Sequence, residues 1–263
     1  MVSYANSHND LPTITEIQAS TEVLSNHDAA AKVVRVKDRF AVKFGGGVEM
    51  QETENMRFVS ANTNVPIPKL FSAFIDQETN LKCIIMEYVP GVTLQTLWPT
   101  LTAEEKAEIT QKIRNIIQEL RKLPAPGYLG AIGRKPFGDG VFWTLEYDPA
   151  ISGPLANQAK MNEGILTRLR KKESTAYAEF MTGLLTKTLS SHRIVLMHGD
   201  LQPKNIMVTR TGANADGRKF DITIIDWEIS DGIRNTGNIA AQLFHVVLSQ
   251  SGLKLSPIFS ISI

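Results

Sequence analysis

The chain has very little cysteine and almost no net charge, and each of these features excludes a class of protein. Its 263 residues include one cysteine, Cys83, so an internal disulfide is excluded. Cys83 lies in an apolar run, which indicates a buried thiol in a reducing compartment. The formal net charge is only +1, from 28 basic and 27 acidic side chains. We therefore expect neither nucleic acid nor an anionic membrane as a partner.

The sequence also shows no targeting or membrane-spanning segment. Its first residues, MVSYANSHNDLPT, lack the charged and apolar regions of a signal peptide, and no apolar run approaches the length of a membrane span. We expect a soluble, cytoplasmic protein in which residues 1–13 are loosely ordered. The hydrophobic fraction of 43% is ordinary for a globular chain that folds without disulfides.

The most informative segments are HGDLQPKNIMV at 198–208 and ITIIDWE at 222–228. Kinase-type phosphoryl transfer uses an aspartate that accepts the proton of the substrate hydroxyl and an asparagine, five residues later, that binds magnesium. A further aspartate binds the magnesium that bridges the phosphates. Asp200, Asn205 and Asp226 fit this layout. The sequence thus predicts Asp200 as catalytic base, with Asn205 and Asp226 as Mg²⁺ ligands.

The local pattern places these side chains in loops beside strands. Apolar runs at 194–197, 205–208 and 222–225 predict short buried strands, and Pro203 prevents a helix between the first two. Gly, Asn and Asp residues between the last two runs predict a hairpin. His-Gly-Asp alone is a common turn, and a lone Asp often only caps a strand. The conjunction of all the parts favours the catalytic interpretation, in which His198 braces the loop and has no chemical role.

These motifs resemble those of the aminoglycoside phosphotransferase-like branch of the kinase fold, in which Trp often follows the metal-binding Asp. Further segments resemble small-molecule kinase-like proteins numerous in filamentous fungi, namely VPIPKL (65–70), IIMEYVPGVTL (84–94) and PGYLGAIG (126–133). The resemblance covers residues 33–229. It implies ATP and Mg²⁺ as cofactors and a two-lobed, α+β, protein-kinase-like fold. The expected lobes are a small β-rich N-terminal lobe at 14–89 and a mainly helical C-terminal lobe at 90–263.

The resemblance implies a strand lysine that contacts the ATP phosphates and a helix glutamate that pairs with it. In AVKF, Lys43 lies on a predicted strand, where a solvent-facing lysine is the alternative. The helix predicted over 48–63 offers Glu49, Glu52 and Glu54. Glu52 lies beside the apolar stripe of this helix, so we expect it to pair with Lys43. Glu54 is the second choice, and a solvated acidic face is the alternative.

The segment CIIMEYVPG at 83–91 resembles the hinge of the family. In the family, the backbone of this segment bonds the adenine edge. The resemblance implies that Met86 lies behind the base, with Glu87, Tyr88 and Val89 beside it. An ordinary strand end is the alternative.

The C-terminal lobe is predicted to be largely helical. Thr102 and Glu105 form a capping box, and helical spacing of apolar residues continues from there through residue 122. Spacings of three and four predict two further helices, at 155–171 and 174–190.

Two features of the family are missing. No Gly-x-Gly-x-x-Gly precedes Lys43, since the loop at 25–32 has no glycine, and GGG at 45–47 predicts a turn instead. The 37 residues after Asp226 do not resemble the usual continuation. We therefore expect a truncated or divergent C-terminus, with one helix at 239–248.

Two functional classes follow from these observations. The first is an ATP- and magnesium-dependent phosphotransferase that acts on the hydroxyl of a small molecule. The second is a catalytically silent kinase-like protein that binds nucleotide or a partner, suggested by the C-terminus and the missing glycine loop. A protein kinase is less expected, because no Phe-Gly follows Asp226 and no Ala-Pro-Glu is present. Aminoglycosides, choline, sugars, amino acids and fungal metabolites stay open as acceptors, and the oligomeric state stays open too.

Overall fold

A computed structural model of the chain describes most of the protein, namely residues 10–124, 126–138, 140–188, 194–212, 219–229 and 231–234. The chain divides into two compact units. Unit 1 contains Met1–Leu120 and Asp200–Glu228, and unit 2 contains Arg121–Gly199 and Ile229–Ile263. The expected lobe boundary at residue 89 falls inside unit 1 and stays a prediction. The expectations for residues 1–9 and 235–263 lie outside the described residues.

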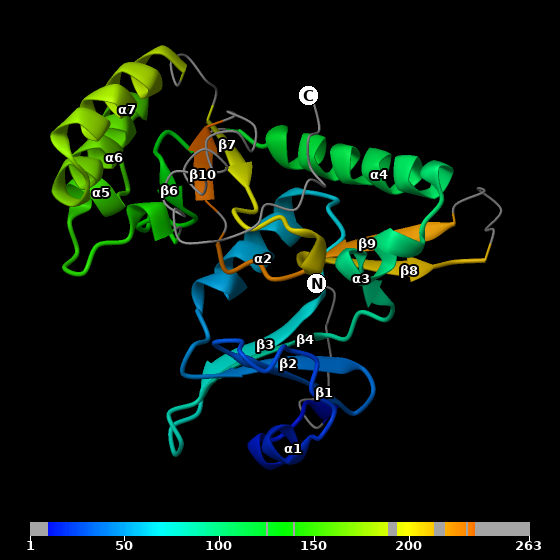
Figure 1. The fold of residues 1–263 in the computed structure, drawn as a ribbon. Helices are drawn as coiled ribbons and strands as arrows, with labels where there is room; N and C mark the ends of the chain where they lie inside the picture. Colours follow the sequence, from blue (N-terminus) through cyan, green and yellow to red (C-terminus); the bar gives the residue numbers. More distant parts are fainter. Residues whose placement is uncertain are drawn as a thin grey trace, which may run out of the picture. The chain divides into compact units, whose positions relative to one another are not determined.

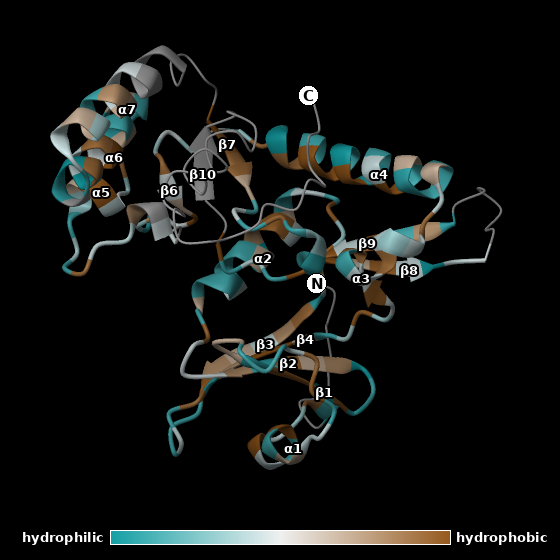
Figure 2. Cartoon of the chain, viewed as in Figure 1, coloured by the Kyte–Doolittle hydropathy of each residue, from teal (hydrophilic) through white to brown (hydrophobic). Residues whose placement is uncertain are grey.

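An antiparallel sheet forms the N-terminal part of unit 1 (Figure 1). Its spatial order is β1-β2-β4-β3, with bounds β1 (Lys32–Val36), β2 (Phe40–Gly45), β3 (Leu70–Ile75) and β4 (Lys82–Glu87). The turn between β1 and β2 contains Lys37 and Asp38 at φ of 49° and 57°, so its backbone is left-handed. The strands are rich in hydrophobic residues, as Figure 2 shows. Cys83 on β4 is buried, as expected.

Helix α1 (Ile14–Ala19) covers one face of this sheet. Ile17 packs in a core with alternate strand residues, among them Phe40, Val42 and Ile85. The helix begins in a capping box formed by Thr13 and Glu16, which was not predicted from the sequence. Because successive strand residues point to opposite faces, the residue after Val42 points away from this core. That residue is Lys43.

Helix α2 (Gln51–Asn62) follows the sheet's first hairpin. The Gly-rich segment before it forms a turn in which Val48 N donates to Gly45 O over 3.4 Å, so the predicted turn is confirmed. The helix predicted over 48–63 is confirmed, although it begins three residues later and ends one residue earlier than expected. Glu52, Met56 and Val59 are buried along one side of the helix. A glutamate on this buried stripe must find a cationic or polar partner.

A second sheet of unit 1 carries the hairpin predicted from the sequence. It has the order β5-β8-β9, with bounds β5 (Val92–Thr93), β8 (Ile206–Arg210) and β9 (Phe220–Ile224). Strand β8 begins one residue later than predicted because Pro203–Asn205 form the 3₁₀ turn η4. The antiparallel pairing of β8 and β9 confirms the hairpin, while the tip at 213–218 lies outside the described residues.

Helices α3 (Leu94–Leu97) and α4 (Ala103–Arg121), joined by η2 (Trp98–Thr100), complete unit 1. The predicted capping box is confirmed, since Glu105 N donates to Thr102 Oγ1 over 3.3 Å and Thr102 N donates to Glu105 Oε2 over 2.9 Å. Figure 2 shows hydrophobic and hydrophilic residues alternating along α4. Its buried residues recur at helical spacing, at Ile109, Ile113, Ile116 and Leu120.

Unit 2 contains three helices and a small sheet among its described residues. The helices are α5 (Pro149–Ser152), α6 (Gln158–Lys172) and α7 (Thr175–Thr188), and a 3₁₀ turn, η3 (Gly140–Phe142), precedes them. The sheet has the order β6-β10-β7, with bounds β6 (Gly130–Ala131), β7 (Ile194–Met197) and β10 (Asp231–Arg234). Helix α6 begins three residues later than predicted, because the Asn157 side chain accepts from Lys160 N over 3.1 Å and caps it.

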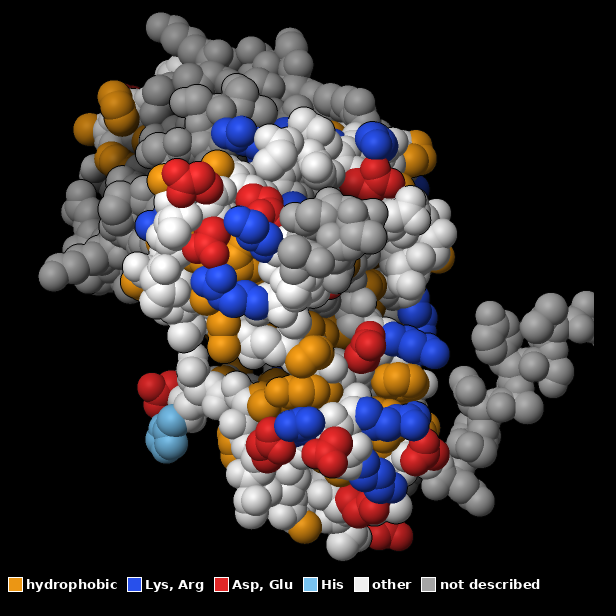
Figure 3. All heavy atoms as spheres, turned by 90° about the vertical axis from the view of Figure 1, so that its right-hand side faces the viewer, with side chains coloured by type: hydrophobic (Ala, Val, Ile, Leu, Met, Phe, Trp, Pro, Cys, Tyr) orange, Lys and Arg blue, Asp and Glu red, His pale blue; other side chains and the backbone are white. Residues whose placement is uncertain are grey.

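The surface matches the even charge balance of the sequence. On the face drawn in Figure 3, acidic and basic side chains are interspersed, and neither sign forms a separate patch. Across the described ranges, none of the helices is both long and apolar enough to span a bilayer.

Candidate functional site

The hairpin of β8 and β9 brings Asn205 and Asp226 to the same end of the second sheet. Ile206 pairs with Ile224, and Ile225 N donates to Asn205 O over 3.0 Å. Asn205 therefore lies at the start of one strand and Asp226 just past the end of its partner. The sequence predicted that Asp226 lies at a strand end, and the structure places it there. The binding of Mg²⁺ by Asn205 and Asp226 stays a prediction.

Asp200 is fixed by donors from its own loop. Asn205 Nδ2 donates to the Asp200 backbone oxygen and to Oδ2, over 2.9 Å in each case. Lys204 Nζ lies 3.3 Å from Oδ2, and the Gln202 side-chain amide donates to Oδ1. The carboxylate is thus held in one orientation while a quarter of the side chain, 23%, stays exposed. An ionised carboxylate held in this way can accept a proton from a hydroxyl.

Asp226 adopts a left-handed backbone conformation, with φ of 66°. Residues other than glycine seldom adopt it, and they do so mostly where the surrounding structure enforces it. Trp227 supplies that constraint, because its side chain is fully buried and its indole Nε1 donates to Ile224 O over 2.9 Å. Asn55 Nδ2 donates to Trp227 O over 2.7 Å, and Trp227 N donates to Glu52 Oε1 over 3.2 Å. The turn after β9 is therefore anchored to helix α2.

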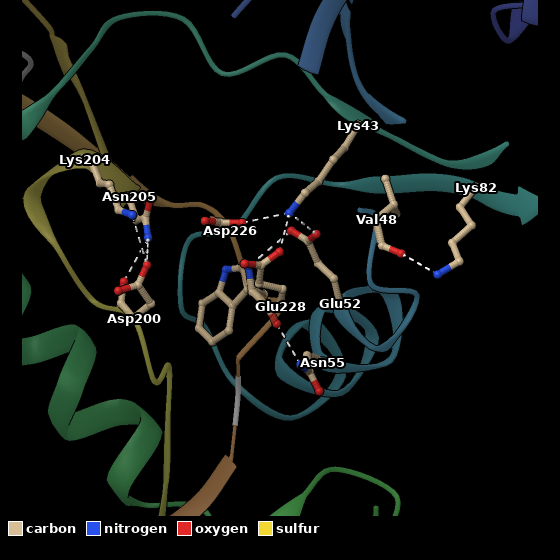
Figure 4. A network of polar contacts seen from close by, with 11 residues as sticks. Lys43, Val48, Glu52, Asn55, Lys82, Asp200, Lys204, Asn205, Asp226 and Glu228 are labelled. Carbon is tan, nitrogen blue, oxygen red and sulfur yellow. Dashed lines mark hydrogen bonds and ion pairs between the residues drawn. The ribbon is translucent and has the colours of Figure 1, made fainter. Parts of the chain in front are cut away.

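The Lys43 ammonium lies among three carboxylates (Figure 4). Its Nζ atom is 2.8 Å from Glu52 Oε2, 2.9 Å from Asp226 Oδ1 and 2.9 Å from Glu228 Oε2. Burial acts to lower the pKa of Lys43, but the three carboxylates outweigh burial and raise that pKa above its ordinary value. Burial raises the pKa of Glu52, and the Lys43 ammonium opposes the rise. Lys43 is therefore cationic near neutral pH.

Two results concern the glutamates of the site. Glu52 is the glutamate of α2 that contacts Lys43, as expected from its position beside the apolar stripe of the helix. Glu54 was the second choice. Glu228 was not predicted as a site residue, although its segment IIDWE was part of the motif. The backbone turns at Asp226, so the alternation of strand residues does not place Glu228, and no local pattern in the sequence marks it as a site residue. His198, to which no chemistry was assigned, is buried.

The chemistry of these side chains fits a divalent cation. The carboxylate oxygens of Glu52, Asp226 and Glu228 include ligand atoms that all lie within 4.8 Å of one another. Carboxylate oxygens suit Mg²⁺, and so does an amide oxygen. Asn205 directs its Nδ2 atom to Asp200, so its Oδ1 atom is the one available to a cation.

The hinge residues end strand β4. Met86 is buried and lies two residues from Ile84, which pairs with Lys43, so Met86 shares the sheet face of Lys43. Glu87 N donates to Lys69 O over 2.9 Å, and Tyr88 N donates to Arg39 O over 2.8 Å. Val89 follows outside the strand. Their contact with a nucleotide stays a prediction.

Comparison with known proteins identifies the family. Residues 24–231 match the family described as "Phosphotransferase enzyme family" (APH), and the chain therefore belongs to this family. No curated protein sequence matches the chain. The expected membership is confirmed, while the narrower resemblance to fungal proteins stays a prediction.

Solved structures with a similar fold include aminoglycoside phosphotransferases. A ternary complex of a thermostable APH(4)-Ia mutant with ADP and hygromycin B has a TM-score of 0.56 at 15% identity, covering 88% of this chain and 74% of that one. The GDP complex of an aminoglycoside 2'-phosphotransferase-IIIa mutant has a TM-score of 0.51 at 16% identity, covering 82% and 67%. The streptomycin-ATP-APH(2")-IIa ternary complex has a TM-score of 0.50 at 16% identity, covering 85% and 70%. The predicted α+β kinase-like fold is confirmed.

Proposed function

We propose that this protein is an ATP- and magnesium-dependent phosphotransferase that moves the γ-phosphoryl group to a hydroxyl of a small molecule. The observation that carries the proposal is the contact of Lys43 with Glu52 and Asp226. Asp226 follows the strand that pairs with the segment after Asn205, and Asn205 in turn holds Asp200 within the same compact unit. Family membership supports the reaction class.

In this proposal, the sheet and the second hairpin hold the two ends of the nucleotide. Lys43 contacts the phosphates, and Glu52 fixes its ammonium. Asp226 and Asn205 would hold Mg²⁺, which when bound neutralises negative charge on the phosphates. Met86 supplies an apolar surface for the base. The N–H groups of Glu87 and Tyr88 already bond within the sheet, so the base edge would meet the next N–H, that of Val89.

Asp200 acts as the general base. As the acceptor hydroxyl oxygen forms its bond to the γ-phosphorus, its proton passes to the Asp200 carboxylate, the bond between that phosphorus and the bridging oxygen breaks, and ADP leaves. The bonds from Gln202, Lys204 and Asn205 keep the carboxylate aimed through this step. Positioning of this kind is the main contribution a protein makes to phosphoryl transfer.

The acceptor is proposed only as a small molecule with a hydroxyl group. The similar structures were solved with hygromycin B and streptomycin among their ligands, which supports an acceptor of that size. At sequence identities of only 15% and 16%, the similarity supports the same fold but does not identify the acceptor. A cytoplasmic location, predicted from the composition of the first residues, the lack of a long apolar run and the single cysteine, belongs to the same proposal.

The test is direct transfer. Purified protein is incubated with ATP, Mg²⁺ and a panel of sugars, amino alcohols, amino acids and aminoglycosides, and phosphorus NMR detects a new phosphate ester together with ADP. Asp200→Asn should abolish the ester signal, whereas the matched change Asp221→Asn, at an exposed position of β9, should leave it unchanged. Nucleotide binding without transfer to any acceptor would instead support the alternative, a catalytically silent kinase-like protein.

A further inference from the structure

Acidic charge exceeds basic charge around Lys43. Its single ammonium contacts the carboxylates of Glu52, Asp226 and Glu228. Glu52 is nearly inaccessible, with 1% of its side chain exposed, whereas the side chains of Asp226 and Glu228 are 29% and 33% exposed. A phosphate group that approaches Lys43 therefore meets carboxylates of its own sign, and like charges at close range in a partly buried site repel strongly.

Glu228 differs from the other two carboxylates in how it is held. Glu52 is fixed twice, by Lys43 Nζ and by Trp227 N. Asp226 is set by the left-handed turn that the buried Trp227 anchors. Glu228 comes after that turn, and among the described residues its ion pair is with Lys43. Its longer side chain has three rotatable bonds, so it can leave Lys43 without any change in the backbone.

We propose that Glu228 is a positioning residue that makes nucleotide binding depend on the divalent cation. Without a cation, Glu228 stays on Lys43 and opposes the phosphates by charge. With a cation bound alongside the phosphates, the excess of negative charge is removed and Lys43 exchanges Glu228 for a phosphate oxygen. The inference rests on the proposed function, because it concerns the same nucleotide site.

Thermodynamic linkage makes the proposal measurable. The ratio of the ADP dissociation constant without metal to that with metal is the coupling factor between the two ligands, and such factors commonly lie at about 5–150. Isothermal titration calorimetry would measure ADP binding to the full chain in excess EDTA and in saturating Mg²⁺. In Glu228→Gln, we expect the metal-free affinity to rise about tenfold, within that range, while the affinity with Mg²⁺ changes little.

A matched variant controls for a general loss of negative charge. Glu49→Gln removes the same charge from an exposed side chain two residues before α2, and it should leave both affinities as they are in the parent protein. Thermal melting of each variant shows that the fold is kept. Since Glu228 is one-third exposed, its replacement by an uncharged isostere leaves no buried cavity.

Three results would overturn the proposal, and they are distinguishable. If Glu228→Gln weakens ADP binding in the presence of Mg²⁺ and leaves the metal-free affinity unchanged, Glu228 is a metal ligand. In that case it does not oppose the binding of the phosphates to Lys43. If both affinities match those of the parent protein, Glu228 has no part in nucleotide binding, and the proposed function still stands. If the folded parent chain binds no ADP under either condition, the proposed function fails together with this inference.

Discussion

The side chains of Lys43 and Asp226 meet although 183 positions separate them in the sequence, with Nζ 2.9 Å from Oδ1. Lys43 comes from the first hairpin of the N-terminal sheet and Asp226 from the turn after β9. The contact joins the two chain segments that make up unit 1, Met1–Leu120 and Asp200–Glu228. Predictions about this contact therefore concern stability as well as ligand binding.

Lys43→Met should destabilise the protein because it leaves the buried Glu52 carboxylate without its cation. Breaking one partner of a buried ion pair costs about 3–5 kcal/mol. Urea denaturation would measure the loss in the free energy of unfolding. Adding Glu52→Gln to Lys43→Met should recover part of the loss. The control, Lys32→Met on the exposed edge of the same sheet, should change stability by less than about 0.5 kcal/mol. Equal effects of the two single substitutions would contradict the buried pair.

Trp227→Ala should be among the most damaging substitutions. The side chain is fully buried and its indole bonds to Ile224 O, so its removal leaves a large cavity and costs about 3–5 kcal/mol. The matched change Trp143→Ala affects a side chain that is 58% exposed, and it should cost less than about 1 kcal/mol. Guanidinium denaturation compares the two. A similar midpoint for both variants would show that Trp227 does not anchor the turn.

Asn55→Ala should cost about 1–3 kcal/mol, because the buried Trp227 carbonyl loses the side-chain donor that reaches it over 2.7 Å. Asn62 on the same helix also donates its side-chain amide to a carbonyl, that of Phe58, but it is exposed. We expect Asn62→Ala to cost far less, since water replaces the lost donor there. Thermal unfolding followed by circular dichroism would rank the two variants. The opposite ranking would contradict a role for Asn55 in holding the turn.

The left-handed backbone of Asp226 predicts which replacements the turn accepts. Asn tolerates positive φ, whereas a β-branched residue does not. Both Asp226→Asn and Asp226→Val remove the carboxylate charge, so their difference reports the backbone strain together with the hydrogen bond that the Asn oxygen can still accept from Lys43. We expect the Val variant to be less stable than the Asn variant by about 1–2 kcal/mol, measured by urea denaturation. Equal stabilities would mean that the turn relaxes to another conformation.

Much of the candidate site could be predicted from local patterns in the sequence. The spacing of Asp200 and Asn205, and the hairpin that leads to Asp226, follow from short-range rules on turns and strands. The choice of Glu52 followed from helical periodicity, since only a residue beside the buried stripe of α2 can face the sheet. Lys43 was chosen by the resemblance of AVKF to the family's strand motif, because alternation along the strand also allows a lysine that faces solvent.

Contacts between distant segments could not be predicted in the same way. Glu228 reaches Lys43 because Trp227 is buried against α2, and nothing near Glu228 in the sequence encodes that packing. The contact of Asp10 with Arg39, at 2.7 Å, is another example, because residues 1–13 were expected to be loosely ordered as a chain terminus. Local patterns report average tendencies, whereas these contacts depend on tertiary structure.

The measurement that tests the account most directly is ATP binding to the purified chain by isothermal titration calorimetry, with Mg²⁺ and with EDTA. The account predicts Mg²⁺-dependent binding that is lost in Asp226→Ala and kept in the control Asp221→Ala, an exposed position on β9. A folded parent protein that binds no ATP in the presence of Mg²⁺ would contradict a nucleotide site around Lys43 and Asp226.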